Sequence, residues 1–226
     1  FGALSVGLSD FNVTCATDSY ISQQAIRYNC EYNSLVIPPI ISALEPQPKV
    51  DLVVVKLTKN LGYLEHQLRS IVNAQSTCSI VALGKTTLVT SAVIKLFEQY
   101  FSNVSTSLAK KKSRLIFAEL QSGAPQDHKQ EKEPHHTLMS QVKCTQPDLT
   151  LRSYANVFSK DKLDIGGRFL ADHLLPIDQP NEMFTAIDLG CGNGLLGINW
   201  LKVNQGLLHA DSLCIFSDES FMAVES

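Results

Sequence analysis

The chain has 226 residues, of which 44% are hydrophobic and 18% are charged, and its formal net charge is −3. This composition excludes collagen, coiled-coil and disordered proteins and predicts a globular protein with one large core or two modest ones. The acidic balance argues against a whole-surface polyanion binder, because binding phosphates needs a surplus of Lys and Arg. No apolar stretch approaches the roughly 20 residues of a membrane span, so we expect no membrane role.

The cysteines indicate the cellular compartment, and the two ends of the chain indicate whether the sequence is a whole protein. The six cysteines are widely spaced and form no C-x-x-C pair. Their order therefore predicts neither a disulfide framework nor a zinc site, and we expect a reducing cytoplasm. The chain opens on FGALSVG and stops at FMAVES, within an amphipathic pattern. We expect it to be an internal portion of a longer protein.

Strand-like and helical segments alternate through the first half of the chain. This order is typical of βαβ units and predicts a largely parallel sheet. The four prolines in residues 38–48 predict a loop there. We expect strands over 11–17, 50–57 and 78–84, and helices over 19–33, 61–74 and 86–101.

A polar stretch separates the two halves. It contains Gly and Pro but no apolar residue larger than Ala, so it cannot bury itself in a core. We expect a domain over 1–121, a linker over 122–136 and a second domain over 137–226. His128, His135 and His136 fall in the linker without a neighbouring Cys, and we expect no metal site there.

The second half repeats the alternation around a glycine-rich turn. We expect a hairpin from 137–144 and 149–156, helices over 163–176 and 195–203, and strands over 183–189 and 212–217. The last strand runs into Asp218 and Glu219. The order strand, glycine loop, helix, strand and acid is that of a nucleotide-binding half-unit.

The glycine loop, AIDLGCGNGLLG, fits two ligand classes. A glycine-rich turn before a helix lets a ligand approach bare backbone at the positive end of the helix dipole. Gly192, Gly194 and Gly197 match the dinucleotide pattern G-x-G-x-x-G. The same loop, read from Asp188 through Gly190, also matches the D-x-G-x-G-x-G pattern of S-adenosylmethionine (SAM) enzymes.

The acid of the second pattern separates the two classes. A carboxylate at the strand end would repel a pyrophosphate, whereas it suits the sulfonium and ammonium groups of SAM. Asp218 can accept both ribose hydroxyls, with Glu219 as the neighbouring candidate. The spacing of 26 from Gly192 to Asp218 also exceeds the roughly 20 of the dinucleotide fingerprint.

Several motifs together resemble one family. YANVFSKDKLDIGGRFLADHLLP, IDLGCGNGLLG and DESFMAVES, with FGALSVGL, DSYISQQAIRYN, VVVKLTKNLGYLEHQLR and LAKKKSRLI, are similar to the ribosomal RNA methyltransferases that modify guanine N2. The resemblance is closest to the large-subunit methyltransferase G family. It implies an α/β, duplicated Rossmann-like class I SAM methyltransferase fold. It also implies that the N-terminal copy is degenerate and that the C-terminal copy, which we expect to be truncated in this chain, methylates one guanine of 23S ribosomal RNA.

The duplication can be traced within the sequence. Gly2 matches Gly194, and the Asp-Ser-Tyr at 18–20 matches the Glu-Ser-Phe at 219–221. The first copy carries Lys56-Leu-Thr-Lys59 where an active copy would place Asn-Pro-Pro-aromatic. A copy that keeps the fold and loses the site is expected to be an RNA recognition platform.

The resemblance implies the site residues. The cofactor residues are Asp188, Gly190, Cys191, Gly192, Asn193, Gly194, Asp218, Glu219, Phe158 and Ser159, with ordinary core packing as the alternative for Phe158. The RNA-binding candidates are Lys110, Lys111, Lys112 and Arg114, because the sequence from Lys85 to Arg114 contains six basic residues and only one acidic residue. The alternative is that these residues form an ordinary solvated basic face. The guanine-holding Asn-Pro-Pro-aromatic motif is expected beyond Ser226, so no catalytic residue is named.

Two alternative functions stay open at this point. One is an NAD-type oxidoreductase built on the glycine loop, and the other is a non-catalytic RNA-binding module on a methyltransferase fold. For the methyltransferase, the expected cofactor is SAM and the expected partner is large-subunit ribosomal RNA, with no metal and no membrane. We expect a monomer.

Overall fold

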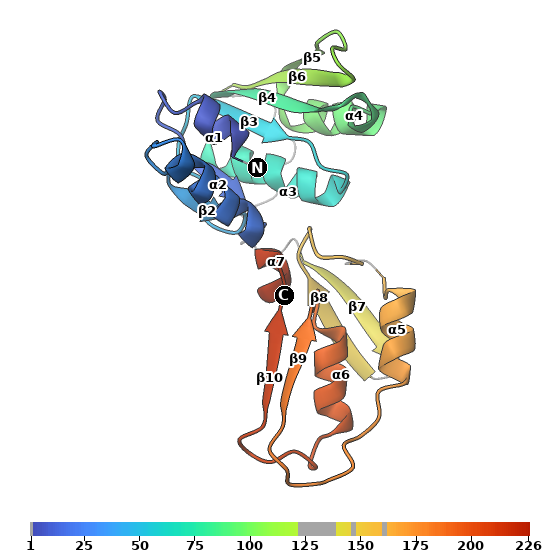
Figure 1. Ribbon diagram of the computed structural model, residues 1–226. Coiled ribbons are helices and arrows are strands. Elements are labelled where there is room, and N and C mark those ends of the chain that lie inside the picture. The colour runs from blue at the N-terminus through green and yellow to red at the C-terminus, as the bar shows by residue number, and fades with distance from the viewer. Residues whose placement is uncertain (1, 122–138, 146–147, 160–161) are drawn as a thin grey trace. The chain divides into compact units, whose positions relative to one another are not determined.

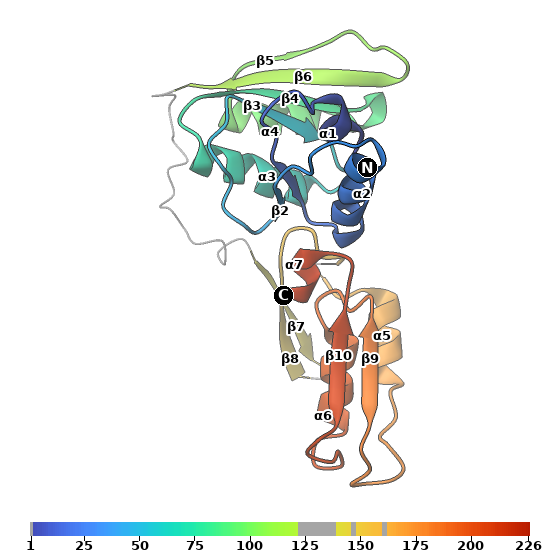
Figure 2. The same ribbon diagram turned by 60° about the vertical axis from the view of Figure 1, so that its left-hand side comes forward.

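The computed structural model describes residues 2–121, 139–145, 148–159 and 162–226 (Figures 1 and 2). These residues group into two compact units. Unit 1 combines Phe1–Leu44 with Leu138–Ser226, and unit 2 is Glu45–Thr137. The first segment of the chain therefore packs with the C-terminal region, although the whole of unit 2 lies between them in sequence.

Unit 2 is built on a four-stranded sheet. Its elements are β3 (Leu52–Lys56), α3 (Leu61–Ala74), β4 (Cys78–Lys85), η1 (Thr86–Leu88), α4 (Ser91–Tyr100), β5 (Ser102–Thr106) and β6 (Ser113–Leu120). The strand order is β3-β4-β6-β5, and only β3 and β4 are parallel. The expected largely parallel sheet is therefore wrong for this unit. The reason is that β5 and β6, which the sequence did not predict, form an antiparallel hairpin.

The two long helices of unit 2 begin at side-chain caps. Asn60 accepts a hydrogen bond from the Tyr63 backbone N–H at the start of α3, and Thr90 accepts one from the Val93 N–H at the start of α4. The Thr90 cap explains why α4 begins later than the predicted residue 86. The helices enclose a core with the sheet, in which Leu64, Leu68, Ile80, Phe97 and Ile116 are fully buried.

The proline-rich stretch contains a short strand. β2 (Ile40–Ser42) pairs in parallel with β1 (Cys15–Thr17), and the Cys15 N–H donates to the Pro39 carbonyl at 2.9 Å. The prediction of a continuous loop over 38–48 is therefore wrong at these positions. Proline removes only a donor, so its carbonyl still accepts from a neighbouring strand.

The remaining elements belong to unit 1. They are α1 (Ala3–Gly7), α2 (Tyr20–Tyr32), β7 (Ser140–Thr145), β8 (Asp148–Ser153), α5 (Ile165–Asp172), β9 (Thr185–Leu189), α6 (Leu195–Val203), β10 (Leu213–Ser217) and α7 (Phe221–Val224). The predicted β7–β8 hairpin is confirmed, and β9 and β10 are parallel. Figure 1 shows α6 along the β9–β10 pair, with α5 beside it. Leu151 of β8, Ala171 of α5 and Leu195 of α6 form a buried core.

Side chains alternate across the β9–β10 pair, as the pleat requires. Asp188 and Phe216 stand opposite each other in register, and both approach Gly197 of α6. The other face carries Ile187, Leu189 and Ile215, all of which are exposed. Asp188 and Phe216 therefore lie on the face of the strand pair that packs against α6, and Asp188 is two residues before the first glycine of the loop.

Candidate cofactor site

The glycine loop turns the chain from β9 into α6. Gly190, Gly192 and Gly194 have φ angles of +73°, +54° and +78°. This left-handed region costs glycine nothing, whereas a side chain would strain it. Gly194 is the N-cap of α6, and its carbonyl accepts from the Ile198 N–H at 2.9 Å. Three alternate glycines are thus needed for the shape of the turn itself.

The glycines differ in what lies beside them. A Cβ atom at Gly190 or Gly192 would meet no atom within 4 Å, whereas one at Gly197 would lie 2.4 Å from Cε1 of Phe216. Gly197 is therefore required for close packing of α6 on β10. Gly190 and Gly192 border open space, which is what the approach of a ligand to the backbone needs.

Asp188 lies beneath the first turn of α6. Its Oδ2 atom accepts a hydrogen bond from the Gly197 N–H at 2.8 Å. A carboxylate in this position is stabilised by the helix dipole and by the amide groups at the helix N-terminus. The position that a pyrophosphate takes in dinucleotide-binding proteins therefore already holds a negative charge.

Asp218 follows β10 and closes the other side of the loop. Its Oδ2 atom accepts from the Gly192 N–H at 3.0 Å, and its Oδ1 atom accepts from the Ser220 N–H at 2.9 Å. The Ser217 carbonyl accepts from the N–H groups of Gly190 and Cys191. The structure thus brings Asp188, the loop and Asp218 together, although 30 residues separate the two acids in the chain.

Glu219 does not join this group. Its carboxylate accepts a hydrogen bond from the Ser19 hydroxyl, and its carbonyl accepts from the Tyr20 N–H at 2.9 Å. Both partners belong to the N-terminal segment of unit 1. Asp218, rather than Glu219, is therefore the acid at the loop.

Cys191 contributes a neutral thiol. The residue is buried, and its backbone N–H donates to the Ser217 carbonyl. Burial raises the pKa of this thiol, and the nearby carboxylates of Asp218 and Asp188 raise it further. A thiol in this setting stays protonated at neutral pH, so it is no nucleophile.

The end of β8 contacts the loop, and the segment that carries Phe158 and Ser159 follows it in the chain. Asn193 of the loop donates from Nδ2 to the Ser153 hydroxyl at 3.3 Å, and Ser153 is fully buried at the end of β8. Phe158 lies a few residues further on and is 76% exposed, which excludes the alternative of core packing in the described chain. Ser159 has a φ of +57°.

The structure also shows how the two copies correspond. Gly2 caps α1 with a φ of +85°, as Gly194 caps α6, and neither cap has a side-chain bond. Thr17 accepts from the Ser19 N–H at 3.2 Å, as Asp218 accepts from the Ser220 N–H. Thr17 therefore stands where the second copy has its loop acid.

The basic residues predicted to bind RNA lie at the β5–β6 turn of unit 2. Lys110 and Ser113 exchange two backbone hydrogen bonds of 2.9 Å, and Lys111 and Lys112 between them have φ angles of +49° and +60°. The three lysines are exposed. Arg114 differs, because its guanidinium donates to the Ser107 carbonyl and the Thr106 hydroxyl and so holds the hairpin.

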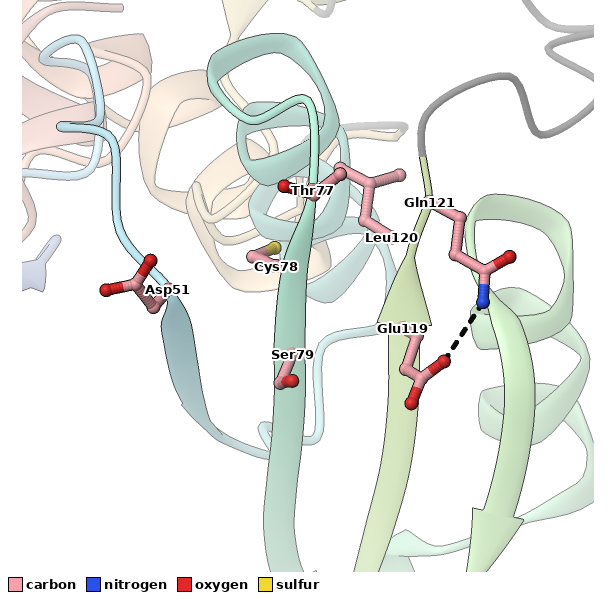
Figure 3. A pocket seen from close by; sticks show the side chains of 7 residues that line it. All are labelled: Asp51, Thr77, Cys78, Ser79, Glu119, Leu120 and Gln121. Carbon is pink, nitrogen blue, oxygen red and sulfur yellow. Dashed lines mark hydrogen bonds between the residues drawn. The ribbon is translucent and has the colours of Figure 1, made fainter.

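Unit 2 also has a shallow pocket at the amino ends of β3 and β4 (Figure 3). Its lining residues are Asp51, Thr77, Cys78, Ser79, Glu119, Leu120 and Gln121. Ligands of α/β sheets bind at the carboxyl ends of the strands, the opposite end from this one. Glu119 accepts hydrogen bonds from Asn103 and Gln121, which lower its pKa. We therefore assign neither a catalytic nor a ligand-binding role to the residues that line this pocket.

Two absences complete the description. In the described residues no three His, Cys, Asp or Glu side chains come together as a metal ion would require. Within the same ranges, no helix has the length and apolar character of a membrane span. The linker histidines His128, His135 and His136 lie outside the described residues.

Comparison with known families decides the classification. The family model "RLMG N-terminal domain" matches residues 1–122, and the model "Methyltransferase small domain" matches residues 148–226. The chain belongs to the RLMG N-terminal domain family. This confirms the resemblance to the large-subunit methyltransferase G family.

Relatives of this chain agree with the family membership. Two relatives are named ribosomal RNA large subunit methyltransferase G, one from Aliivibrio fischeri strain ES114 and one from Pseudoalteromonas translucida. Their sequence identities to this chain are 38% and 40%, and both alignments cover the whole of it. The chain spans about half the length of these relatives, 56% in each case. A solved 16S rRNA N2 methyltransferase (RsmC) of T. thermophilus, in complex with AdoMet and guanosine, matches with a TM-score of 0.68. It is 16% identical, and the match covers 98% of this chain and 57% of that one. The α/β methyltransferase fold is thereby confirmed.

Proposed function

We propose that the protein of which this chain is part transfers the methyl group of SAM to the N2 amino group of a guanine in large-subunit ribosomal RNA. Family membership and the names of the relatives support this proposal. The observation that carries it is the pair of carboxylates, Asp188 and Asp218, that accept hydrogen bonds from the backbone of the glycine loop and of α6.

The charge of this loop favours SAM over a dinucleotide. A pyrophosphate needs backbone N–H donors, but those of Gly190, Gly192 and Gly194 donate to acceptors within the chain. It would also face two carboxylates at close range, which costs Coulomb energy in a partly buried site. The sulfonium and ammonium groups of SAM are cations, for which the same carboxylates are favourable neighbours. The NAD-type oxidoreductase is therefore the weaker alternative.

The residues present fit SAM in a second respect. Each oxygen of an ionised carboxylate has about two acceptor positions, and each oxygen of Asp218 accepts one backbone N–H. Each can accept one more hydrogen bond, which matches the two vicinal hydroxyls of a ribose. The open space beside Gly190 and Gly192 lets the remainder of the cofactor lie against the backbone. Phe158 is exposed and offers an apolar surface that we assign to the cofactor.

The chain's residues would bind and orient rather than transfer protons. SAM supplies an electrophilic methyl group, and transfer is an in-line displacement whose rate comes largely from the alignment of nucleophile and leaving group. Asp188, Asp218 and the loop would hold the cofactor in that alignment. No Asn-Pro-Pro-aromatic motif occurs in these 226 residues, so no guanine-holding group is assigned to them.

We place RNA recognition at the edge of the unit 2 sheet where the parallel strands β3 and β4 end. From Glu45 to Gln121 the sequence has ten Lys or Arg and five Asp or Glu. The Lys110–Ser113 turn lies at this end, because Lys85 at the end of β4 pairs with Ser113 and the Thr86 N–H donates to the Lys112 carbonyl. Lys56 ends the neighbouring strand β3. Exposed lysines on one rim suit the phosphate backbone of RNA.

The domain division and the cellular location remain proposals. We propose an N-terminal domain of residues 1–121 and a methyltransferase domain from residue 137, and the family models over residues 1–122 and 148–226 support this division. Cys15, Cys30, Cys78, Cys191 and Cys214 are free thiols in the described chain, as is usual in a reducing compartment. We therefore place the protein in the cytoplasm, and a monomer stays a prediction from the sequence.

Two measurements on the full-length protein test the function. Calorimetry should show saturable binding of SAM and no binding of NADH; tight NADH binding with none for SAM would reject the methyltransferase. Incubation of the protein with SAM and deproteinised large-subunit rRNA should yield N2-methylguanine in nuclease digests analysed by mass spectrometry. A protein that binds RNA but leaves every guanine unmethylated would instead be a binding module.

A further inference from the structure

Asp18 is a buried acid of the N-terminal segment that touches the second copy. It is only 3% exposed, yet it lies outside the loop and carries no role in the proposed cofactor site. Burying a carboxylate is costly unless hydrogen-bond donors surround it. The donors that surround Asp18 come from the two segments on either side of the cofactor loop.

Three donors converge on this carboxylate. Oδ1 accepts from the Met222 backbone N–H at 2.8 Å, and Oδ2 accepts from the Ser220 hydroxyl at 2.5 Å and from Nδ2 of Asn156 at 2.8 Å. The Asp18 carbonyl also accepts from the Phe221 N–H at 2.9 Å. One residue of the first copy thus holds the start of α7 and the segment that leads to Phe158.

The contacts continue to the loop acid through Ser220. The Ser220 N–H donates to Oδ1 of Asp218, and Oδ2 of Asp218 accepts from the Gly192 N–H. Ser220 also caps α7, because its hydroxyl oxygen accepts from the Ala223 N–H at 3.2 Å. A change at Asp18 therefore reaches Asp218 through a single intervening residue.

We propose that Asp18 is a positioning residue for the candidate SAM site: its carboxylate fixes Asp218 through Ser220, and Asn156 helps to hold that carboxylate in place. The first copy thereby shapes the candidate cofactor site of the second copy. This inference rests on the proposed function, because it takes the site beside Asp218 and the glycine loop to hold SAM.

The proposal makes a specific prediction for Asp18→Asn in the full-length protein. The amide has the same size, but it offers one oxygen where the carboxylate offers two, and its NH₂ group must then face a donor. Asp218 should shift, and the KM for SAM should rise about tenfold, the equivalent of one charge-assisted hydrogen bond. At saturating SAM, kcat should stay within twofold of the parent, and the KM for RNA should not change.

This pattern separates positioning from a loss of structure. A variant that merely unfolds in part lowers the active fraction, so kcat falls while the KM for SAM stays the same. Asp10→Asn is the matched control, because Asp10 is an exposed acid of the same segment. It should leave both constants unchanged.

A milder variant covers the case in which Asp18→Asn does not fold. Asn156→Ala removes one donor to the carboxylate from a half-buried position, and it should raise the KM for SAM about threefold, in line with a hydrogen bond of ordinary strength. In the double variant the two effects should be less than additive, because both break the same hydrogen bond. A folded Asp18→Asn or Asn156→Ala protein with the parent's KM for SAM would overturn the proposal. Failure of the parent itself to bind SAM would instead reject the proposed function.

Discussion

At the scale of single residues, the glycines of the loop separate into two roles that the sequence pattern treats alike. Gly192 combines a positive φ with open space, whereas Gly197 has a close neighbour in Phe216. The first property points to a ligand and the second to packing. The pattern G-x-G-x-x-G therefore mixes a candidate binding glycine with a structural one.

The Gly192→Val variant tests the ligand role. A branched side chain would fill the space in which the cofactor meets the backbone, so we expect calorimetry to detect no SAM binding. The strained φ should also lower the free energy of unfolding by about 1–2 kcal/mol.

Gly206→Val is the matched control, since Gly206 has a φ of +83° and equally open surroundings but lies beyond the far end of α6. It should be destabilised similarly and bind SAM as the parent does. Binding within twofold of the parent in Gly192→Val would remove the loop as the cofactor site.

Cys191 offers a chemical test of the loop's electrostatics. Burial and two carboxylates raise its thiol pKa, so at pH 8 the thiolate fraction is smaller than in an unfolded chain, and alkylation requires the thiolate. Mass spectrometry should show iodoacetamide modifying Cys191 at least about tenfold more slowly than a peptide of the same local sequence, since burial also limits access. Raising the pH toward the elevated pKa should increase the rate. Equal rates in protein and peptide at pH 8 would contradict this account.

At the scale of elements, the predictions succeeded where local signals agreed. α3 has the bounds that the sequence predicted because its apolar spacing coincides with a cap at Asn60. The β5–β6 hairpin escaped prediction because its turn residues, Lys111 and Lys112, carry no turn signal, whereas Asn and Gly are usual at these positive φ angles. The bonds of Asp18 could not be predicted either, since they join residues more than 130 positions apart.

The same turn gives a prediction on stability. Replacing Lys111 with Asn and Lys112 with Gly supplies the residues that a two-residue turn with positive φ favours. We expect the free energy of unfolding, measured by urea denaturation, to rise by about 1 kcal/mol, the relief of left-handed strain at two exposed positions. Lys49→Gln with Lys95→Gln removes the same charge from exposed sites outside the turn and serves as control. A gain of equal size in that control would assign the effect to charge rather than to backbone conformation.

At the scale of the whole molecule, the two copies divide the work in the proposed function. The second copy carries the carboxylates that suit a cationic cofactor, and unit 2 carries a surplus of Lys and Arg although the chain is acidic overall. The glycine loop and Asp188 could be predicted because they lie next to each other in the sequence. The assembly of Phe1–Leu44 with the C-terminal region could not, because interactions between distant segments leave no local pattern.

The division predicts that RNA and cofactor binding can be weakened separately. Changing Lys110, Lys111 and Lys112 to Gln should lower the affinity for rRNA and leave the affinity for SAM unchanged, since the turn shares no residue with the glycine loop. Arg114 is left in place because its bonds to Thr106 and Ser107 hold the hairpin. Each lysine that binds a phosphate in the parent contributes to the salt dependence of RNA binding. Its replacement should make the slope of log affinity against log salt concentration less steep by roughly 0.7–0.9.

The Lys49→Gln/Lys95→Gln control should keep the slope of the parent. A triple variant with the parent's affinity and slope would show that this turn is a solvated basic face, and that RNA is bound elsewhere on the protein.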